Sequence, residues 1–334
     1  MDNESLLNAL KHVKYPGYTR DIVSFGLVRE ARFDKGHATI ALSLATTDPD
    51  IAAQLRTDIE KTLHHSGIPK VTVDIAINAP VAAPTPTPIN GVRHIIAIAS
   101  GKGGVGKSTL ATNLACALAA QPGRAGRIGL LDSDIYGPSI PLMMGLAERP
   151  EVEGEHLLPP ERFGVKTMSL GLLIDADAPV IWRGPMVQKA LRQFTTHVAW
   201  GELDILLADL PPGTGDAHLA LIQATPVDGA VIITTPQRAA TTVAQRGAML
   251  FAQTNIPLLG VIENMSGPPF GTGGGEATAR ALKTEFLGHI PLDATLRQSG
   301  DQGIPLVHSA PESPLSRKII QIALRILEKT ALTP

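Results

Sequence analysis

The stretch "ASGKGGVGKSTLA", residues 99–111, decides the fold of this chain. Four residues separate Gly101 from Gly106, Lys107 and Ser108, which is the P-loop pattern whose glycines let backbone amides approach a phosphate. The apolar run "RHIIAIA" before it predicts a buried strand, and the run after it predicts a helix whose N-terminus points at an anion. This context favours a nucleotide site over an ordinary glycine-rich turn. Lys107 is expected between the β- and γ-phosphates, and the Ser108 hydroxyl on Mg²⁺.

Short apolar runs alternate with helical patterns on both sides of this loop, over residues 93–334. The expected strands contain "HIIAIA", "RIGLLD", "DILLADL", "GAVIITT" and "PLLGVIE". The expected helices are 107–120, 185–199, 216–224, 238–253, 275–284 and a closing helix at 313–332. Continuous apolar strands alternating with helices predict an α/β fold, a mostly parallel sheet covered by helices on both faces.

A separate small domain is expected over residues 1–77. Its alternating and helical patterns predict the order α-β-β-α-β, a compact α+β domain. Residues 78–92 form the predicted linker, because they are rich in proline and alanine and contain no charged side chain before Arg93. Proline favours extended geometry, so this linker is expected to be a semi-rigid spacer.

Composition narrows the class of protein. The 334 residues are 44% hydrophobic, so a sizeable core is expected. The net charge is −2, so nucleic acid is not an expected partner. The apolar runs are shorter than the ~20 residues of a membrane helix, and the first residues lack the apolar region of a secretory signal. The single cysteine excludes an internal disulfide framework and fits a reducing compartment. A cytoplasmic protein without stable membrane insertion is expected.

Acidic residues follow two of the predicted strands. Asp209 comes after four apolar residues and before "PPGTGD", which favours a carboxylate that reaches Mg²⁺ through water over an ordinary strand-end cap. Asp132 and Asp134 lie in "LLDSDIYGPS". Two carboxylates two apart on a strand face the same side, so one could orient the attacking water while the other anchors the loop.

Lys102 is an additional lysine inside the P-loop. It either points to solvent or reaches another phosphate oxygen. If a partner subunit supplies it, it works as an arginine finger does.

These residues resemble a known family. "GKGGVGKST" is similar to the deviant Walker A motif of the SIMIBI class, and "LLDSDIYGPSIP", "VIWRGPMVQKALRQF", "DLPPGTGD", "IITTPQ", "LGVIENMS" and "GHIPLD" together resemble the Mrp/ApbC iron–sulfur carrier ATPases. "RDIVSFGLV" resembles the MIP18-like domain fused to many of them. The resemblance implies a homodimeric, Mg²⁺-dependent ATPase that serves iron–sulfur apo-proteins or assembly factors.

The resemblance also implies residue roles. Lys102 would reach ATP across the dimer interface, Asp134 would position the water, and Asn264 would hydrogen-bond the adenine, where the residue alone also fits a turn after a strand. The implied catalytic residues are Lys102, Lys107, Asp134 and Asp209. The implied ATP-binding residues are Gly101, Lys102, Gly103, Gly104, Val105, Gly106, Lys107, Ser108, Thr109 and Asn264, with Ser108 and Asp209 on Mg²⁺.

The chain departs from the family where the cluster is held. Relatives carry a Cys-x-x-Cys pair after "ENMS", so that two subunits supply four thiolates to a bridging cluster. Here "ENMS" (263–266) runs through "GPPFGT" into "GGGE" (273–276), and no cysteine is present. Cys116 is expected to be a packing residue of the P-loop helix, and the ten histidines are scattered. An iron–sulfur cluster therefore follows from the resemblance alone, and no ligand for it is identified.

Two alternative functions stay open at this point. One is a cluster-free, nucleotide-dependent adaptor or heterodimer partner of a carrier. The other is a MinD/ParA-like positioning ATPase, whose amphipathic terminal helix would bind a membrane. For the closing helix of this chain, packing on its own domain is favoured over membrane binding. Trp182 and Arg183 in "IWRGPM" are expected either at a partner surface or in strand-end packing with a surface ion pair.

Overall fold

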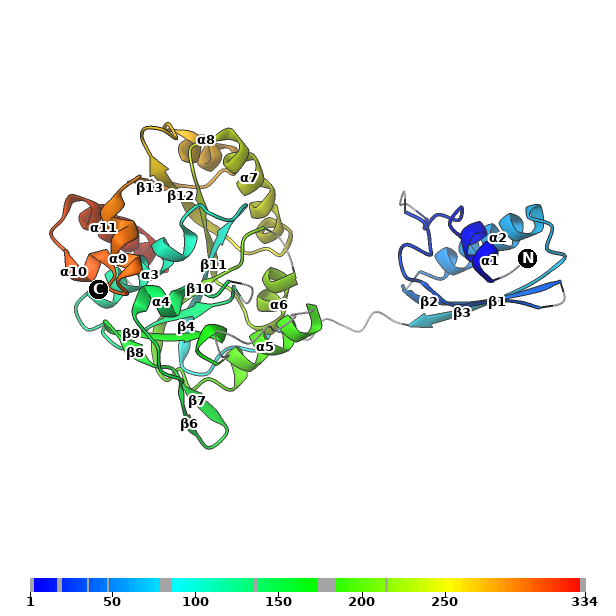
Figure 1. Ribbon diagram of the computed structural model, residues 1–334, viewed down its shortest axis with the longest axis horizontal. Coiled ribbons are helices and arrows are strands. Elements are labelled where there is room, and N and C mark those ends of the chain that lie inside the picture. Colours follow the sequence, from blue (N-terminus) through cyan, green and yellow to red (C-terminus); the bar gives the residue numbers. More distant parts are fainter. Residues whose placement is uncertain are drawn as a thin grey trace. The chain divides into compact units, whose positions relative to one another are not determined.

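The computed structural model describes residues 3–16, 20–34, 36–46, 48–78, 86–134, 137–173, 184–213 and 216–330. Contacts divide the chain into two compact units, Met1–Ala83 and Pro84–Pro334 (Figure 1). Trp182 and Arg183 lie outside the described residues, so their two expected roles stay predictions.

The N-terminal unit is a three-stranded sheet covered by two helices, in the expected order. Its elements are α1 (Asn3–Leu10), β1 (Val28–Asp34), β2 (His37–Ala45), α2 (Pro49–His65) and β3 (Lys70–Asn78). β1 pairs antiparallel with β2, and β2 pairs parallel with β3 because α2 carries the chain back across the sheet. The core comes from one stripe of each helix, including Leu10, Leu55 and Ile59, packed on alternate strand residues such as Ile40 and Leu42.

The second unit is built on an eight-stranded sheet of order β13-β12-β11-β4-β10-β5-β9-β8. Its parallel strands are β4 (Val92–Ser100), β5 (Ile128–Asp132), β9 (Val165–Ser169), β10 (Leu203–Asp209), β11 (Gly229–Thr234), β12 (Leu258–Ser266) and β13 (Phe286–Pro291). β8 (Glu161–Arg162) closes one edge antiparallel to β9, and β6 (Glu151–Glu153) and β7 (His156–Leu158) form a hairpin. This confirms the predicted α/β fold class.

Helices cover both faces of this sheet (Figure 1). One face carries α3 (Lys107–Ala119), α4 (Ile140–Met144), α9 (Ala294–Asp301), α10 (Leu306–Ser309) and α11 (Pro314–Lys329). The other carries α5 (Gly184–Thr196), α6 (Asp216–Ala224), α7 (Arg238–Gln253) and α8 (Gly274–Ala281). Strand β4 contributes side chains to the cores on both faces of the sheet. Ile96 and Ile98 belong to the core under α3, whereas Ile95 and Ala97 belong to the core under α5 to α8.

The structure differs from the predicted elements mainly at their ends. The helix expected over 185–199 is α5, which ends at Thr196, and the one expected over 275–284 is α8, which ends at Ala281. Strands β6 to β9 and β13 and helices α4, α9 and α10 were not predicted. Most of them have only two to five residues, which are too few to show a period. Asp134 also lies beyond the end of β5, so the expectation that it shares a strand face with Asp132 was wrong.

The closing helix α11 packs on its own domain. Its apolar side chains Ile319, Ile322, Ala323 and Ile326 are at most 4% exposed and belong to the core that also contains α3. An apolar stripe that is already buried cannot also enter a bilayer, so the membrane-binding interpretation of this helix was wrong. Within the ranges that the structure describes, no helix has the length and apolar character to cross a membrane.

Candidate nucleotide-binding site

The P-loop lies between the carboxyl end of β4 and the N-terminus of α3, at the centre of the sheet. Gly104 and Gly106 have φ angles of 76° and 78°, in the left-handed region that favours glycine. A Cβ on Gly106 would lie 2.3 Å from Nδ2 of Asn264, and one on Gly101 would lie 2.4 Å from the backbone nitrogen of Ala244. Each of these glycines therefore serves both the loop and the close packing around it.

Lys107 and Ser108 converge on the carboxylate of Asp209. The Lys107 ammonium donates to Oδ1 and the Ser108 hydroxyl donates to Oδ2, each at 2.6 Å. Lys107 is 6% exposed and Asp209 is fully buried. Burial raises the pKa of the Asp209 carboxyl, while the charge of Lys107 and these two hydrogen bonds act to lower it. A serine hydroxyl and a carboxylate at contact distance form an oxygen donor set of the kind Mg²⁺ prefers.

Asp132 lies opposite Asp209 in the register of β5 with β10. Its carboxylate accepts from the backbone N–H of Asp134 at 3.1 Å, from that of Ile140 at 3.3 Å and from the Ser169 hydroxyl at 3.0 Å. Burial, followed by the charge of Asp209, raises the pKa of Asp132 to about 7. Asp132 therefore holds the loop that carries Asp134, and Asp134 is half-buried two residues beyond the end of β5.

Lys102 and Gly103 lie on the outer part of the loop. A Cβ on Gly103 would lie 3.8 Å from Cγ of Pro212, so the segment after Asp209 runs beside the P-loop. Gly213 N–H donates to the Ser100 carbonyl at 2.9 Å, and this bond holds the segment after Asp209 beside the start of the P-loop. The Lys102 side chain is half-buried, and none of the described residues forms an ion pair with its ammonium.

Asn264, near the end of β12, faces a pocket of about 220 Å³ beside the P-loop. Its Nδ2 donates to the Val105 carbonyl at 2.8 Å. Its Oδ1 is buried and has no hydrogen-bond partner among the described residues. An unpaired buried acceptor is costly, and a ligand that donates a hydrogen bond to this oxygen would remove that cost. Gly106 and Thr109 line the same pocket, which connects it to the phosphate loop.

The far wall of this pocket was not assigned from the sequence. Pro291, Leu292 and Asp293 line it, together with Leu142 from α4 and the Arg297–Asp301 ion pair on α9. The available signal was "GHIPLD", which contains the carboxyl end of β13 and the two residues after it, since carboxyl ends of neighbouring parallel strands meet at one sheet edge. Asp293 itself caps α9 by accepting from Thr295 N–H at 2.7 Å. The hydrogen bond from the Thr295 hydroxyl, followed by this backbone bond, lowers the pKa of Asp293.

His218, near the start of α6, was also not predicted. The side chain is 1% exposed, and neither ring nitrogen has a partner in the described part of the chain. Burial, and then the charge of Lys107, lower its pKa to about 4. The helix that follows the Asp209 loop therefore carries a neutral imidazole close to Lys107.

The segment after β12 closes on itself. Gly267 N–H donates to the Gly271 carbonyl at 2.7 Å, and Gly271 N–H donates back at 2.9 Å. The Glu263 carboxylate, 1% exposed, accepts from Gly273 N–H at 3.2 Å and from Gly275 N–H at 2.7 Å, which caps α8. No thiol is present in this segment.

Cys116 lies inside the core between α3 and α4. It is 3% exposed, its sulfur lies 4.0 Å from that of Met144, and burial raises the pKa of its thiol to about 12. A thiol that stays protonated is a poor metal ligand. Among the described residues, no group of three or more His, Cys, Asp or Glu side chains could hold a metal ion.

Comparison with known protein families matches nearly the whole chain. A family model described as NUBPL iron-transfer P-loop NTPase matches residues 91–327, and one described as iron–sulfur cluster assembly protein matches residues 3–75. An iron–sulfur cluster carrier protein of Synechocystis is 41% identical over 99% of both chains. The Escherichia coli carrier is 47% identical over 71% of this chain and 67% of its own, and mouse iron–sulfur cluster transfer protein NUBPL is 43% identical over 75% and 82%.

Solved structures agree with the fold. The nucleotide-binding protein of Archaeoglobus fulgidus in complex with ADP matches with a TM-score of 0.56 and 39% identity, over 64% of this chain and 88% of its own. The cell division ATPase MinD of Pyrococcus furiosus matches with a TM-score of 0.57 and 23% identity, over 71% and 99%, which shows the shared P-loop fold.

Proposed function

Because the chain belongs to the Mrp/ApbC family, which includes the NUBPL iron-transfer P-loop NTPases, we propose that it is a Mg²⁺-dependent ATPase acting in iron–sulfur cluster assembly or delivery. The proposed ATPase activity is supported by the hydrogen bonds of Lys107 and Ser108 to Asp209, each 2.6 Å long, next to the glycine-rich P-loop. The cytoplasm is the proposed compartment.

The phosphate-binding residues have complementary tasks. Backbone amides of Gly103 to Thr109 would bind the phosphates, and the Lys107 ammonium would exchange Asp209 for the β- and γ-phosphate oxygens. Ser108 would hold Mg²⁺ directly and Asp209 through water. When bound, the ion supplies positive charge to the phosphate oxygens. Asp134, held by its backbone bond to Asp132, would orient the attacking water.

Adenine recognition is assigned to Asn264. Its unpaired Oδ1 fits the exocyclic amino group of adenine, which donates, whereas guanine presents a carbonyl oxygen at the corresponding position. Asn264→Ala is expected to weaken ATP binding about tenfold, the scale of one lost hydrogen bond in a buried site. Binding of labelled ATP and GTP to both proteins measures the effect, and unchanged discrimination would place the base elsewhere.

A homodimer is the proposed working form. Lys102 is the argument for it, because its ammonium lacks an ion-pair partner in the described chain and lies beside the phosphate loop. Supplied to the nucleotide of the other subunit, it would stabilise charge on the transferred phosphoryl group. Recipient apo-proteins or assembly factors are the proposed further partners.

The cluster would be cargo, because no ligand set that fits it is present among the described residues. One buried thiol per subunit gives two per dimer, below the four that a bridging cluster uses. Delivery therefore requires that thiolates come from a partner. This observation favours a second candidate function, the cluster-free adaptor or heterodimer partner of a carrier, which keeps the ATP switch while another subunit holds the cargo.

Transfer to an apo-enzyme tests the proposal. An apo-[4Fe–4S] enzyme is activated anaerobically by a cluster donor with MgATP, in the presence of this protein or of its Lys107→Ala variant. Faster activation by the wild type only is the expected result. If the protein leaves the rate unchanged while it still hydrolyses ATP, delivery is excluded and the ATPase assignment survives. If activation needs an added Cys-x-x-Cys relative, the adaptor function is supported.

A further inference from the structure

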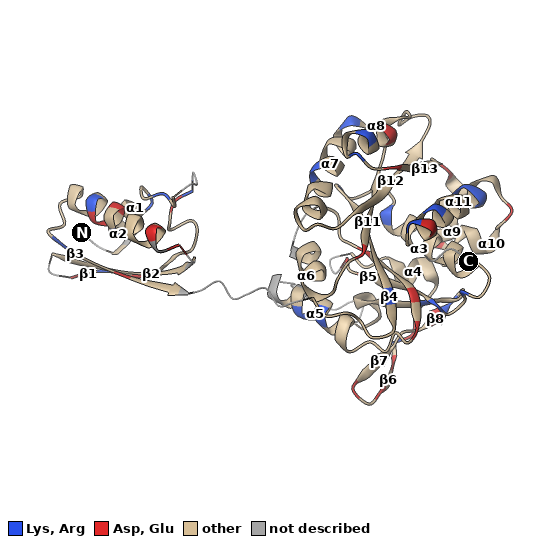
Figure 2. Ribbon diagram, turned by 180° about the vertical axis from the view of Figure 1, so that it is seen from behind, with Lys and Arg blue, Asp and Glu red and all other residues tan. Residues whose placement is uncertain are grey.

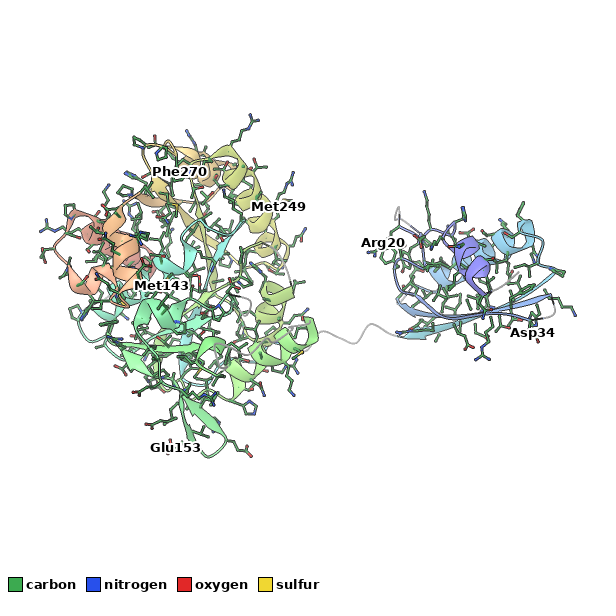
Figure 3. The ribbon with its side chains drawn as sticks, viewed as in Figure 1. Arg20, Asp34, Met143, Glu153, Met249 and Phe270 are labelled. Atoms are coloured by element: carbon green, nitrogen blue, oxygen red, sulfur yellow. The ribbon has the colours of Figure 1, made fainter. Side chains whose placement is uncertain are left out.

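The outer surface of α5, α6 and α7 combines cations with exposed apolar side chains. These helices lie side by side on one face of the sheet in both ribbon views (Figures 1 and 2). We name the following set the basic helical face: Met186, Lys189, Arg192, Leu219, Arg246 and Met249. The three apolar members are between 37% and 57% exposed. In Figure 3, Met249 lies at the outer edge of α7, away from the sheet.

A groove runs between α5 and α6 within this face. It has a volume of about 290 Å³ and is lined by Gln188, Lys189 and Arg192 on one wall and by Ala220, Gln223 and Ala224 on the other. The two cations are three residues apart and therefore lie on one side of α5. The small alanines of α6 leave room for an incoming side chain, and the described residues that line the groove include no acid.

The charge of this face opposes that of the whole molecule. The three helices contain four cations, Lys189, Arg192, Arg238 and Arg246, and one acid, Asp216, whereas the chain as a whole carries a net charge of −2. None of these four cations forms an ion pair with any described residue. Unpaired cations gathered on one face attract a partner of opposite charge.

We propose that the basic helical face docks an acidic, amphipathic segment of a partner protein. Carboxylates of that segment pair with Lys189 and Arg192 in the groove, and its apolar side chains pack on Met186, Leu219 and Met249. Exposed methionine and arginine are typical of protein interfaces, while a surface for DNA or an anionic membrane needs a denser cationic field. The face contains no residue of the nucleotide site, so it can hold a partner while ATP turns over.

If the chain delivers clusters as proposed above, the docked partner is a recipient apo-protein, and only this identification rests on the proposed function. The docking itself is tested on the full-length protein without nucleotide or iron. The probe is a fluorescent peptide of about 20 residues, with leucines at helical spacing and glutamates elsewhere, and its matched control has lysine at every glutamate. Anisotropy at about 50 and 200 mM salt gives the affinities.

The acidic peptide is expected to bind, and to bind more weakly at the higher salt concentration. Lys189→Glu/Arg192→Glu should weaken it at least about tenfold. Arg56→Glu/Lys70→Glu, which changes net charge equally on exposed positions of α2 and β3, should leave it within about twofold. Leu219→Ser/Met249→Ser should weaken it about threefold without altering the salt dependence.

ATP hydrolysis by each variant shows that it is folded, and Lys189→Ala/Arg192→Ala replaces the charge reversal if that variant fails to fold. Three results overturn the proposal: no binding of the acidic peptide, equal binding to the charge-reversed protein, or tighter binding of duplex DNA or phosphatidylserine vesicles. Each leaves the ATPase and transfer experiments unaffected, so the two proposals fail separately.

Discussion

The P-loop and the turn after β12 lie at the same edge of the sheet and have opposite character. Beside the P-loop, Asn264 Oδ1 and the Lys102 ammonium have no hydrogen-bond or ionic partner among the described residues, and the Lys107 ammonium bonds the side chains of Asp209 and Ser108. In the turn, the Gly267–Gly271 bonds and the Glu263 carboxylate satisfy the backbone internally. The first region is arranged for a ligand, whereas the second is closed without one.

This difference separates a region whose polar groups await partners from one whose polar groups are already paired. A binding site costs stability, because polar groups stay unsatisfied until the ligand arrives. A segment that holds no ligand loses nothing by pairing its own groups. Resemblance to carrier proteins therefore supports ATP turnover more directly than it supports cluster binding by this chain alone.

The largest predicted effect is that of a substitution in the P-loop. Lys107→Ala should lower ATP hydrolysis at least about a thousandfold, because the charge between the β- and γ-phosphates is lost. Released phosphate measures turnover, and circular dichroism shows that the variant is folded despite the loss of the buried partner of Asp209. Lys70→Ala, at an exposed position of β3, is the matched control. Normal turnover in Lys107→Ala would remove the P-loop assignment and with it the contrast between the two regions.

Much of this region follows from the sequence because its signals are local. The loop 101–106 and the helix after it are defined by neighbours in the chain, and the "LLAD" ending of β10 marks Asp209. The residues that these side chains contact are far away in the sequence. Asn264 bonds Val105 across 159 positions, and Pro291 joins the same pocket only because β12 and β13 are neighbours. Strand order, which one sequence does not state, decides these contacts.

The next effect concerns His218, the neutral imidazole near Lys107. Its pKa is about 4 in the folded protein and about 6.5 when unfolded, so between these values the unfolded chain binds the extra proton. The free energy of unfolding should therefore fall as the pH drops from 6.5 to 4, by about 3 kcal/mol from this residue. His218→Leu should lose that part of the pH dependence, as measured by urea unfolding at pH 7, 5.5 and 4.

The exposed His156 on β7 provides the matched variant, His156→Leu, whose pH dependence should equal that of the wild type. Subtraction cancels the contributions of other groups, such as Asp132. A constant difference between His218→Leu and wild type across this range would mean that the imidazole is hydrogen-bonded or hydrated, and that this side of the site is less strained than the structure indicates.

A smaller effect is expected for a substitution that weakens the turn after β12. Glu263→Gln should destabilise the protein by about 1–2 kcal/mol, since an amide can accept from only one of Gly273 and Gly275 through its single oxygen. Chemical unfolding measures the change, and faster hydrogen exchange at those two amides would locate it. Glu276→Gln, in the exposed first turn of α8, should cost under about 0.5 kcal/mol. Equal effects would mean that the turn is not held by Glu263.

The smallest predicted effect is none at all. Cys116→Ala should leave bound iron unchanged after anaerobic incubation with iron and sulfide, because the thiol is 3% exposed and its pKa is about 12. Visible absorbance and iron content measure binding. Pro269→Cys/Thr272→Cys, which puts a Cys-x-x-Cys pair on the exposed turn, shows that the assay detects a cluster. A stoichiometric cluster on the wild type that disappears in Cys116→Ala would require α3 to open and expose the thiol. The turn after β12 would then no longer be the segment that decides whether this chain carries its cargo.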